Sequence, residues 1–196
     1  MVVESDDRGP ATSFRLFAHP LPAGELRLLA PYDAPAFLAL IDGEREHFEP
    51  WLPWARELRT VADAAGFIAR GTQRYADCGA PWVGVWSGGA LVGGVLFWPL
   101  DEMGNHIELG YWLARAAGGR GLMTDAVATL VDYCFAELRL NKVVIRCAAT
   151  NLPSRGVPER LGFTTEGVLR EHFILDGTPL DLVFYGMLRS EWKNPR

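Results

Sequence analysis

The feature that most constrains the fold is a short apolar segment that runs into a glycine-rich turn. Residues 108–113 are Glu-Leu-Gly-Tyr-Trp-Leu, and residues 119–124 are Gly-Arg-Gly-Leu-Met-Thr. Apolar residues then recur at helical spacing from residue 126 to residue 138, which predicts a long amphipathic helix that begins at the turn. Residues 142–148 are apolar and β-branched and predict a buried strand. Because a strand, a helix and a strand form a crossover connection, we expect the two strands to be parallel.

The rest of the chain predicts further helices and antiparallel hairpins. Helices are expected over residues 33–43, over residues 60–77 with Thr60 as N-cap, and over the short segment 154–161. Prolines favour an irregular conformation at residues 48–54. Hairpins are expected at the segments 14–30, 82–98 and 163–189. These elements predict an α/β protein in which a mixed sheet carries helices on its faces.

The glycine turn at the start of the long helix is a candidate phosphate-binding site. Backbone N–H groups at a helix N-terminus attract anions, and glycines allow a phosphate to approach the backbone closely. The turn lacks the Gly-Lys-Ser/Thr ending of a Walker loop, and it has Thr124 where a Rossmann turn has its third glycine. The alternative, at this point, is a glycine-rich connection with no ligand.

A second block of sequence follows the strand at residues 142–148. It is Asn-Leu-Pro-Ser-Arg-Gly-Val-Pro-Glu-Arg-Leu-Gly-Phe over residues 151–163, and Glu166-Gly167 come shortly after it. The two blocks in this order resemble the GNAT superfamily of N-acetyltransferases, in particular the RimJ/RimL type that acetylates ribosomal-protein N-termini. The length of 196 residues predicts a single domain, over residues 13–196, and the polar residues 1–12, which include Gly and Pro, predict a loose tail. The resemblance runs from Leu26 to Leu188. It implies the GNAT fold, a mixed sheet of about seven strands splayed into a V and flanked by about four helices.

The resemblance implies that acetyl-CoA binds in the V between the strand with residues 111–113 and the strand with residues 142–148. Backbone amides of the glycine turn would hold the pyrophosphate, and Asn151 would contact the pantetheine arm. Gly118 departs from the family pattern, which often has Gln or Arg there, so one side-chain contact is lost. The implied cofactor-binding residues are Tyr111, Trp112, Leu113, Gly118, Gly119, Arg120, Gly121, Leu122, Met123, Thr124, Asn151 and Ser154.

Ser154 matches the position where family members place a hydroxyl near the thioester sulfur. The leaving CoA thiolate needs a proton or a hydrogen bond, and a neutral hydroxyl can supply one in a cleft of low dielectric constant. The alternative is that Ser154 only caps the short helix.

A neutral amine must attack the thioester, and a base would help because a peptide α-amine has a pKa near 8. Glu108 is the first candidate, since the resemblance places a carboxylate on this strand toward the acceptor, and its alternative is a structural glutamate. His106 shares its strand face, and Glu171 and His172 are further candidates. Proximity alone can also supply much of the rate. A backbone N–H near Trp112 or Leu113 would act as the oxyanion donor.

An aromatic segment resembles the one that lines the acceptor side of Rim-type enzymes. Trp51 and Trp54 are its candidate acceptor-binding residues, together with His106 and Glu171 on the two strand regions named above. The alternative is that the aromatic residues belong to the core or to a dimer surface.

Composition removes several classes of protein. The net charge of −5 argues against a nucleic-acid-binding protein and mildly favours a cationic partner such as an amine. The three cysteines lack metal-ligand spacing, and we expect neither a metal nor a disulfide framework. The N-terminus lacks a signal-peptide pattern and no long apolar run is present, so we expect a cytoplasmic protein with no membrane segment.

The sequence therefore predicts an acetyl-CoA-dependent N-acetyltransferase in which a primary amine attacks the thioester directly in a ternary complex. A protein or peptide N-terminal α-amine is the leading acceptor. Two alternatives stay open: a small-molecule amine such as an antibiotic or a polyamine, and a non-catalytic acyl-CoA-binding module. The family resemblance also suggests a homodimer.

Overall fold

The computed structural model describes residues 19–193, apart from the side chain of Cys78. The expected loose tail and the first strand of the expected 14–30 hairpin lie mostly outside these residues. In chain order the elements are β1 His19–Leu21, β2 Gly24–Leu28, the 3₁₀ turn η1 Pro31–Asp33, α1 Ala34–Gly43, α2 Arg45–Phe48, α3 Pro53–Glu57, α4 Val61–Cys78, β3 Trp82–Ser87, β4 Ala90–Phe97, β5 His106–Leu113, the 3₁₀ turn η2 Arg115–Ala117, α5 Leu122–Ala136, β6 Lys142–Ala148, α6 Leu152–Arg160, β7 Thr164–Leu175 and β8 Thr178–Leu188.

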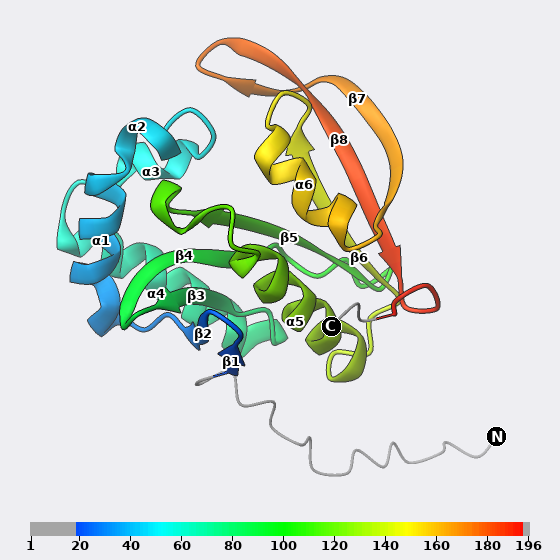
Figure 1. The fold of residues 1–196 in the computed structure, drawn as a ribbon, viewed down its shortest axis with the longest axis horizontal. Helices are drawn as coiled ribbons and strands as arrows, with labels where there is room; N and C mark the ends of the chain where they lie inside the picture. Colours follow the sequence, from blue (N-terminus) through cyan, green and yellow to red (C-terminus); the bar gives the residue numbers. More distant parts are fainter. Residues whose placement is uncertain (1–18, 194–196) are drawn as a thin grey trace.

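One mixed sheet organises the molecule (Figure 1). The described strands lie in the order β1-β2-β3-β4-β5-β6-β8-β7, so the sheet has eight strands where about seven were expected. β5 and β6 are parallel, as the crossover predicts, and every other neighbouring pair is antiparallel. The predicted α/β class and the mixed sheet are confirmed.

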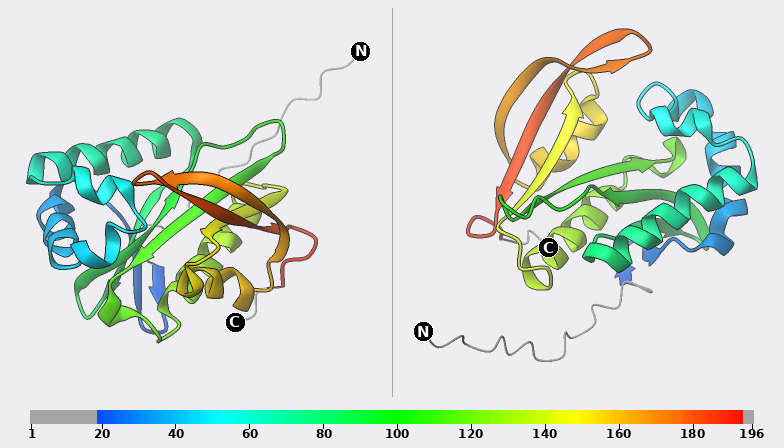
Figure 2. Two further views of the ribbon diagram at one scale, coloured as in Figure 1. Left: turned by 90° about the horizontal axis from the view of Figure 1, so that it is seen from above. Right: turned by 180° about the vertical axis from the view of Figure 1, so that it is seen from behind.

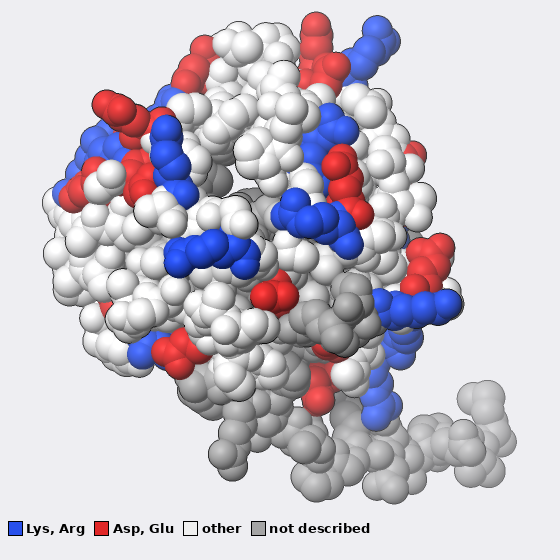
Figure 3. Space-filling view, viewed as in Figure 1, with Lys and Arg blue, Asp and Glu red and all other residues white. Residues whose placement is uncertain are grey.

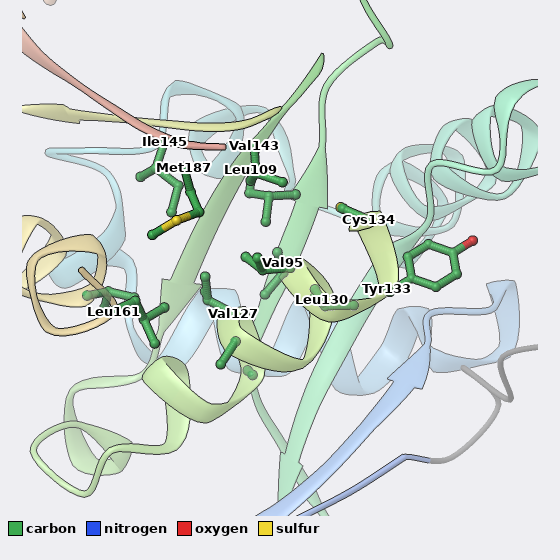
Figure 4. Close-up of a cluster of buried hydrophobic side chains, with 14 of the residues drawn as sticks. Val95, Leu109, Val127, Leu130, Tyr133, Cys134, Val143, Ile145, Leu161 and Met187 are labelled. Carbon is green, nitrogen blue, oxygen red and sulfur yellow. The ribbon is translucent and has the colours of Figure 1, made fainter. Parts of the chain in front are cut away.

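Helices cover both faces of the sheet (Figure 2). α5 and α6 lie on one face, where α5 buries the predicted apolar stripe, including Val127 and Leu130, against strand residues such as Val95 and Val143 (Figure 4). The helices α1 to α4 cover the other face of β3, β4 and the end of β5, around Phe37. Each fully buried aliphatic or aromatic side chain stabilises the fold by about 1.5–3 kcal/mol. Within residues 19–193, no helix is both long enough and apolar enough to cross a bilayer.

Local signals placed several helix ends correctly. Thr60 begins α4 with a capping box, in which its hydroxyl accepts from the N–H of Asp63 at 3.1 Å and the Asp63 carboxylate accepts from the N–H of Thr60 at 2.8 Å. Asp33 precedes α1 as predicted, but its carboxylate accepts from the N–H of Ala30 at 2.9 Å and so closes the turn η1 instead of capping α1.

The expectation of an irregular segment at residues 48–54 is wrong at both of its ends. α2 ends at Phe48 and α3 begins at Pro53, so the described residues contain six α-helices where about four were expected. Pro53 is the first residue of α3, where a missing N–H costs no intrahelical hydrogen bond. Proline therefore starts a helix here instead of preventing one.

Candidate active site

The site is centred on the place where β5 and β6 stop pairing. Their parallel register joins residues 106–109 to residues 142–145 and ends at Leu109 and Ile145, although both strands continue beyond it. The two strands thus splay into the expected V. The V separates two lobes, one made of β1–β5 with α1–α4 and the other of β6–β8 with α6. Figure 3 shows a hollow between the two lobes on this side of the molecule, with uncharged atoms along much of it and Lys and Arg side chains at its margins.

Backbone groups of β5 line the open part of the V. The carbonyl of Glu108 accepts from Trp98 and the N–H of Ala114 donates to Val92, so even-numbered residues of this stretch point their peptide groups toward β4. Successive residues in a strand alternate sides, so the peptide groups of Tyr111 and Leu113 face the V. The peptide group of Trp112 therefore faces away from the V, which leaves Leu113 as the candidate oxyanion donor.

The side chain of Trp112 is also remote from the cofactor side. It is 4% exposed and packs in the aromatic cluster formed with Phe37, Phe48 and Trp54. Trp54 stacks on Phe37 with 6.0 Å between ring centroids. This contact supports the alternative that Trp54 belongs to the core. Trp51 is half-buried.

The glycine turn enters α5 in the conformation that phosphate binding needs. Gly119 and Gly121 have φ angles of 75° and 78°, which an L side chain rarely adopts, and Gly121 is the N-cap of α5. Gly118, Gly119, Arg120 and Gly121 are all exposed, so a ligand can reach their backbone. The first N–H groups of α5 have no partner within the helix and are available to an anion at this turn.

Beyond the glycines, the predicted turn residues contribute in different ways. The side chains of Leu122 and Met123 are buried in the core beneath α5, so they offer a ligand only their backbone. The hydroxyl of Thr124 accepts from Arg160 Nη2 at 3.0 Å and from Nε at 3.2 Å. Arg160, from α6, was not predicted as a site residue, and its position beside the turn adds a cation there.

The start of α6 places Ser154 across the V from β5. Asn151 caps the helix, because its side chain accepts from the N–H of Ser154 at 3.2 Å. The alternative in which Ser154 itself caps the helix is therefore wrong. The Ser154 hydroxyl lies 3.2 Å from the Cys147 thiol, and the Tyr111 hydroxyl donates to the Ser154 carbonyl at 2.6 Å. Burial raises the pKa of Cys147, which keeps the thiol protonated near neutral pH.

Glu108 lies on the opposite face of β5, beside a cation that sequence reasoning missed. Its Oε2 is 2.7 Å from Nε of Arg146 on β6, and the two side chains are 19% and 32% exposed. Burial raises the pKa of Glu108 above its ordinary value, and Arg146 and Trp98 oppose that rise. The sequence did contain a signal for Arg146, because it is the only charged residue in the apolar segment 143–148, and a lone charge in a buried strand suggests a partner or a ligand.

The remaining candidate bases lie in different surroundings. His106 shares the Glu108 face, and its Nε2 lies 4.0 Å from Asp101 Oδ2. Glu171 is exposed, with a φ of 51°, at a register shift between β7 and β8, and its N–H donates to Asp181 at 2.8 Å. The ring of His172 packs edge-on against Phe184 at 5.5 Å. No contact among the described residues joins Glu171 to Glu108.

Gly110 follows Glu108 by two residues on β5, so both lie on the same face of the sheet. Because Gly110 is a glycine, it places no side chain on that face. A Cβ built on it would meet only the Trp98 indole nitrogen, at 3.7 Å. The face that carries Glu108 is therefore free of a side chain at Gly110, just beyond the last paired residues of β5 and β6. Within residues 19–193 no group of His, Cys, Asp and Glu side chains is arranged to hold a metal ion.

A ligand-sized cavity of about 450 Å³ lies where the α1–α2 turn meets the end of β5. His47 Nε2 lies 3.2 Å from the carbonyl of Leu113, and Glu44 accepts from the N–H of Arg115 at 3.2 Å. The cavity is lined by Asp42, Gly43, Glu44, Arg45, Glu46, His47 and Arg115. These contacts fix the far end of β5 to α2 and to the segment that joins α1 and α2.

Known proteins share both the sequence and this architecture. The family model described as an acetyltransferase (GNAT) domain matches residues 25–164. The "Putative ribosomal N-acetyltransferase YdaF" of Bacillus subtilis (strain 168) is 36% identical over 173 residues, which cover 87% of this chain and 94% of YdaF.

Two solved structures are similar to this chain in fold as well as in sequence. The microcin C7 self-immunity acetyltransferase MccE, in complex with acetyl-CoA and AMP, has a TM-score of 0.80 at 25% identity, over 86% of this chain and 93% of MccE. Mycobacterium smegmatis RimJ, in complex with CoA-disulfide, has a TM-score of 0.81 at 25% identity, over 91% of this chain and 88% of RimJ. The splayed parallel strands, the glycine turn and these matches together show that the chain belongs to the GNAT family and is an N-acetyltransferase.

Proposed function

We propose that this enzyme moves the acetyl group of acetyl-CoA to the α-amine of a protein or peptide N-terminus. The observation that carries the proposal is the end of β5–β6 pairing at Leu109 and Ile145, with the glycine turn on one side and Glu108 on the other face. A cofactor held by the turn would enter the V from one face, and an amine would reach the thioester from the other. The name of the relative YdaF, putative ribosomal N-acetyltransferase, supports a ribosomal protein as acceptor.

Each part of the V has a role in this proposal. The backbone of Gly119, Arg120 and Gly121, with the first turn of α5, holds the pyrophosphate of acetyl-CoA. The backbone of Tyr111 and Leu113 pairs with the pantetheine arm beside Asn151, and the Leu113 N–H stabilises the oxyanion. Acetyl-CoA supplies the activated acetyl group.

The transfer itself is a direct displacement. The lone pair of the amine attacks the thioester carbonyl carbon, the carbon–sulfur bond breaks, and CoA leaves as a thiolate. The amine loses a proton to Glu108, and the Ser154 hydroxyl donates a hydrogen bond to the thiolate. A protonated Cys147, whose pKa is raised by burial, is a poor nucleophile, which favours direct attack over an acetyl-cysteine intermediate.

Release of CoA thiol from acetyl-CoA tests the acceptor. One arm uses short peptides that differ only in their first residue, and a second arm uses a panel of polyamines and amine antibiotics. Turnover on peptides alone supports the proposal, and turnover on small amines alone replaces it with modification of a metabolite or a drug. Binding of acetyl-CoA with no turnover in either arm would favour the acyl-CoA-binding module. A cytoplasmic location and a homodimer stay predictions.

A further inference from the structure

Arg146 and Glu108 form a pair of opposite charges on the acceptor face of the sheet. Glu108 pairs in register with Val144 of β6, and Arg146 is the next residue of β6 on the same face, just beyond the last paired residues. The pair therefore lies at the point where the V begins, near Gly110, which places no side chain on this face.

The guanidinium of Arg146 keeps its hydrogen-bonding capacity. Its Nε lies 2.7 Å from Glu108 Oε2, yet it is buried without an aligned hydrogen-bond partner. Within residues 19–193 the structure records no hydrogen bond from either Nη atom of Arg146. An arginine carries five N–H donors in a planar fork, so this side chain has unused donors close to the reaction site.

Neighbouring aromatic rings hold the guanidinium in place. Its central carbon lies 5.5 Å from the centroid of the Phe184 ring, and Phe184 packs in turn against the His172 ring. About a third of the Arg146 side chain stays exposed, so a ligand in the cleft can reach it. The other charged groups near the pair are His106 on β5 and the ion pair between Lys142 and Glu166.

The chemistry of an acceptor can match both charges at once. In a peptide N-terminus, the α-amine nitrogen and the carbonyl oxygen of the first residue lie about 3 Å apart. A lysine side chain or a polyamine carries its amine with no carbonyl oxygen at that distance. A carboxylate and a guanidinium side by side would therefore distinguish the first kind of amine from the second.

We propose that Arg146 is a specificity residue that binds the carbonyl oxygen of the acceptor's first residue while Glu108 receives the proton of its α-amine. The acceptor class is then α-amino acyl compounds, which include peptide N-termini and amino-acid amides. This inference rests on the proposed function, because it concerns the acceptor of the same acetyl transfer.

The test compares two acceptors that differ in the carbonyl group. Alaninamide has it and isopropylamine lacks it, and each rate is expressed per neutral amine so that the difference in amine pKa does not enter. The wild-type enzyme is expected to prefer alaninamide in kcat/KM. Arg146→Met is expected to lower kcat/KM for alaninamide by about 10- to 10²-fold more than for isopropylamine. This difference corresponds to the loss of one charge-assisted hydrogen bond to the carbonyl oxygen.

A matched control separates this effect from a general loss of charge. Lys142→Met removes a cation from the same face of the same strand, and it should leave the ratio of the two kcat/KM values unchanged. Arg146→Lys keeps the positive charge but loses the planar set of guanidinium donors, and it should retain part of the preference for alaninamide over isopropylamine. Calorimetric binding of alaninamide to the CoA complex gives a readout without turnover, in which Arg146→Met should weaken binding and Lys142→Met should not.

The outcomes also separate this inference from the proposed function. Equal losses on both acceptors in Arg146→Met would show that Arg146 acts only on Glu108, and would overturn the inference while peptide acetylation stands. A wild-type enzyme that prefers amines without a carbonyl would overturn both proposals. A thermal melt of each variant identifies any loss that comes from misfolding.

Discussion

The hydroxyl of Tyr111 donates a 2.6 Å hydrogen bond to the backbone carbonyl of Ser154, and it joins β5 to α6 where β5 and β6 no longer pair. Burial raises the pKa of Tyr111 well above its ordinary value, so the hydroxyl remains a donor at every pH of interest. This hydrogen bond and the 3.7 Å contact of the same hydroxyl with the Cys147 thiol on β6 connect the two sides of the V where the strands no longer pair.

Removal of this bond should destabilise the protein. Tyr111→Phe leaves the Ser154 carbonyl without its donor, and we expect the free energy of unfolding to fall by about 1–3 kcal/mol. Urea unfolding followed by fluorescence measures the change. Tyr32→Phe, at a tyrosine that is 80% exposed, should leave the stability unchanged. Equal stability of the two variants would show that the bond does not hold the V together.

Ser154→Ala should slow the acetyl transfer without loosening the helix. Asn151 caps α6 through the backbone N–H of Ser154, which alanine keeps. We expect kcat to fall by about 10- to 10²-fold because the leaving thiolate loses its donor, while the Kd for acetyl-CoA stays near the wild-type value. Single-turnover kinetics and calorimetry measure the two quantities, and Ser87→Ala, next to the exposed turn between β3 and β4, is the control. A normal single-turnover rate would remove Ser154 from the mechanism.

The pH profile of Glu108→Gln tests the base. Burial raises the pKa of Glu108, and only the ionised carboxylate accepts a proton, so kcat/KM of the wild type should fall as the pH falls through that raised pKa. The variant should lack this acidic limb and keep only the limb that comes from the amine. Above the pKa its kcat/KM should be about 10²-fold lower than that of the wild type.

The control for Glu108 removes the same charge from an exposed position. Glu102→Gln, in the loop between β4 and β5, should reproduce the wild-type profile. If the profiles of Glu108→Gln and the wild type coincide, the amine loses its proton to solvent and the glutamate is structural.

The glycine turn should depend on backbone conformation and not on side chains. Gly119→Ala and Gly121→Ala force an L residue to a φ of 75° or 78°, which costs about 1–2 kcal/mol and displaces the N–H groups from the phosphate. We expect the Kd for CoA to rise in both variants. Gly88→Ala, at a φ of 59° in the β3–β4 turn, should lose similar stability but bind CoA normally.

The tip of the β7–β8 hairpin is tied to the opposite lobe across the cleft. Arg56 of α3 forms an ion pair with Asp176 at the hairpin turn, and the tip reaches toward α3 in Figure 2. The hydrogen bonds between the two side chains, and then their opposite charges, raise the pKa of Arg56 and lower that of Asp176. Because the pair is exposed, its loss should affect acceptor binding more than stability.

The KM for a peptide acceptor tests the role of the ion pair between Arg56 and Asp176. Arg56→Ala should raise KM for the peptide and leave the melting temperature unchanged, and the exchange Arg56→Asp with Asp176→Arg should restore the wild-type KM. Salt should raise the wild-type KM by screening the pair. Arg70→Ala, at an exposed position of α4, is the control. If the exchanged pair keeps the raised KM, the contact does not shape the cleft.

Local patterns predicted much of the fold because their causes lie within a few residues. The stripe of α5, the β-branched run of β6 and the capping box at Thr60 each depend on neighbours along the chain. The helix α3 escaped the same reasoning, since a proline counts as a breaker until its place in the first turn is known. The four residues of α2 are too few to show a helical period.

The sequence by itself determined the family, the order of the elements and the glycine turn, because motif spacing and turn chemistry are local properties. Only the tertiary structure decided that Glu108 meets Arg146, that the peptide group of Trp112 faces away from the V, and that Arg56 reaches Asp176. Strand register and the face of each side chain depend on partners far away in the chain, and a shift of one residue would reverse every face. The physical reason is that these pairings form through long-range burial, which no short stretch of sequence contains.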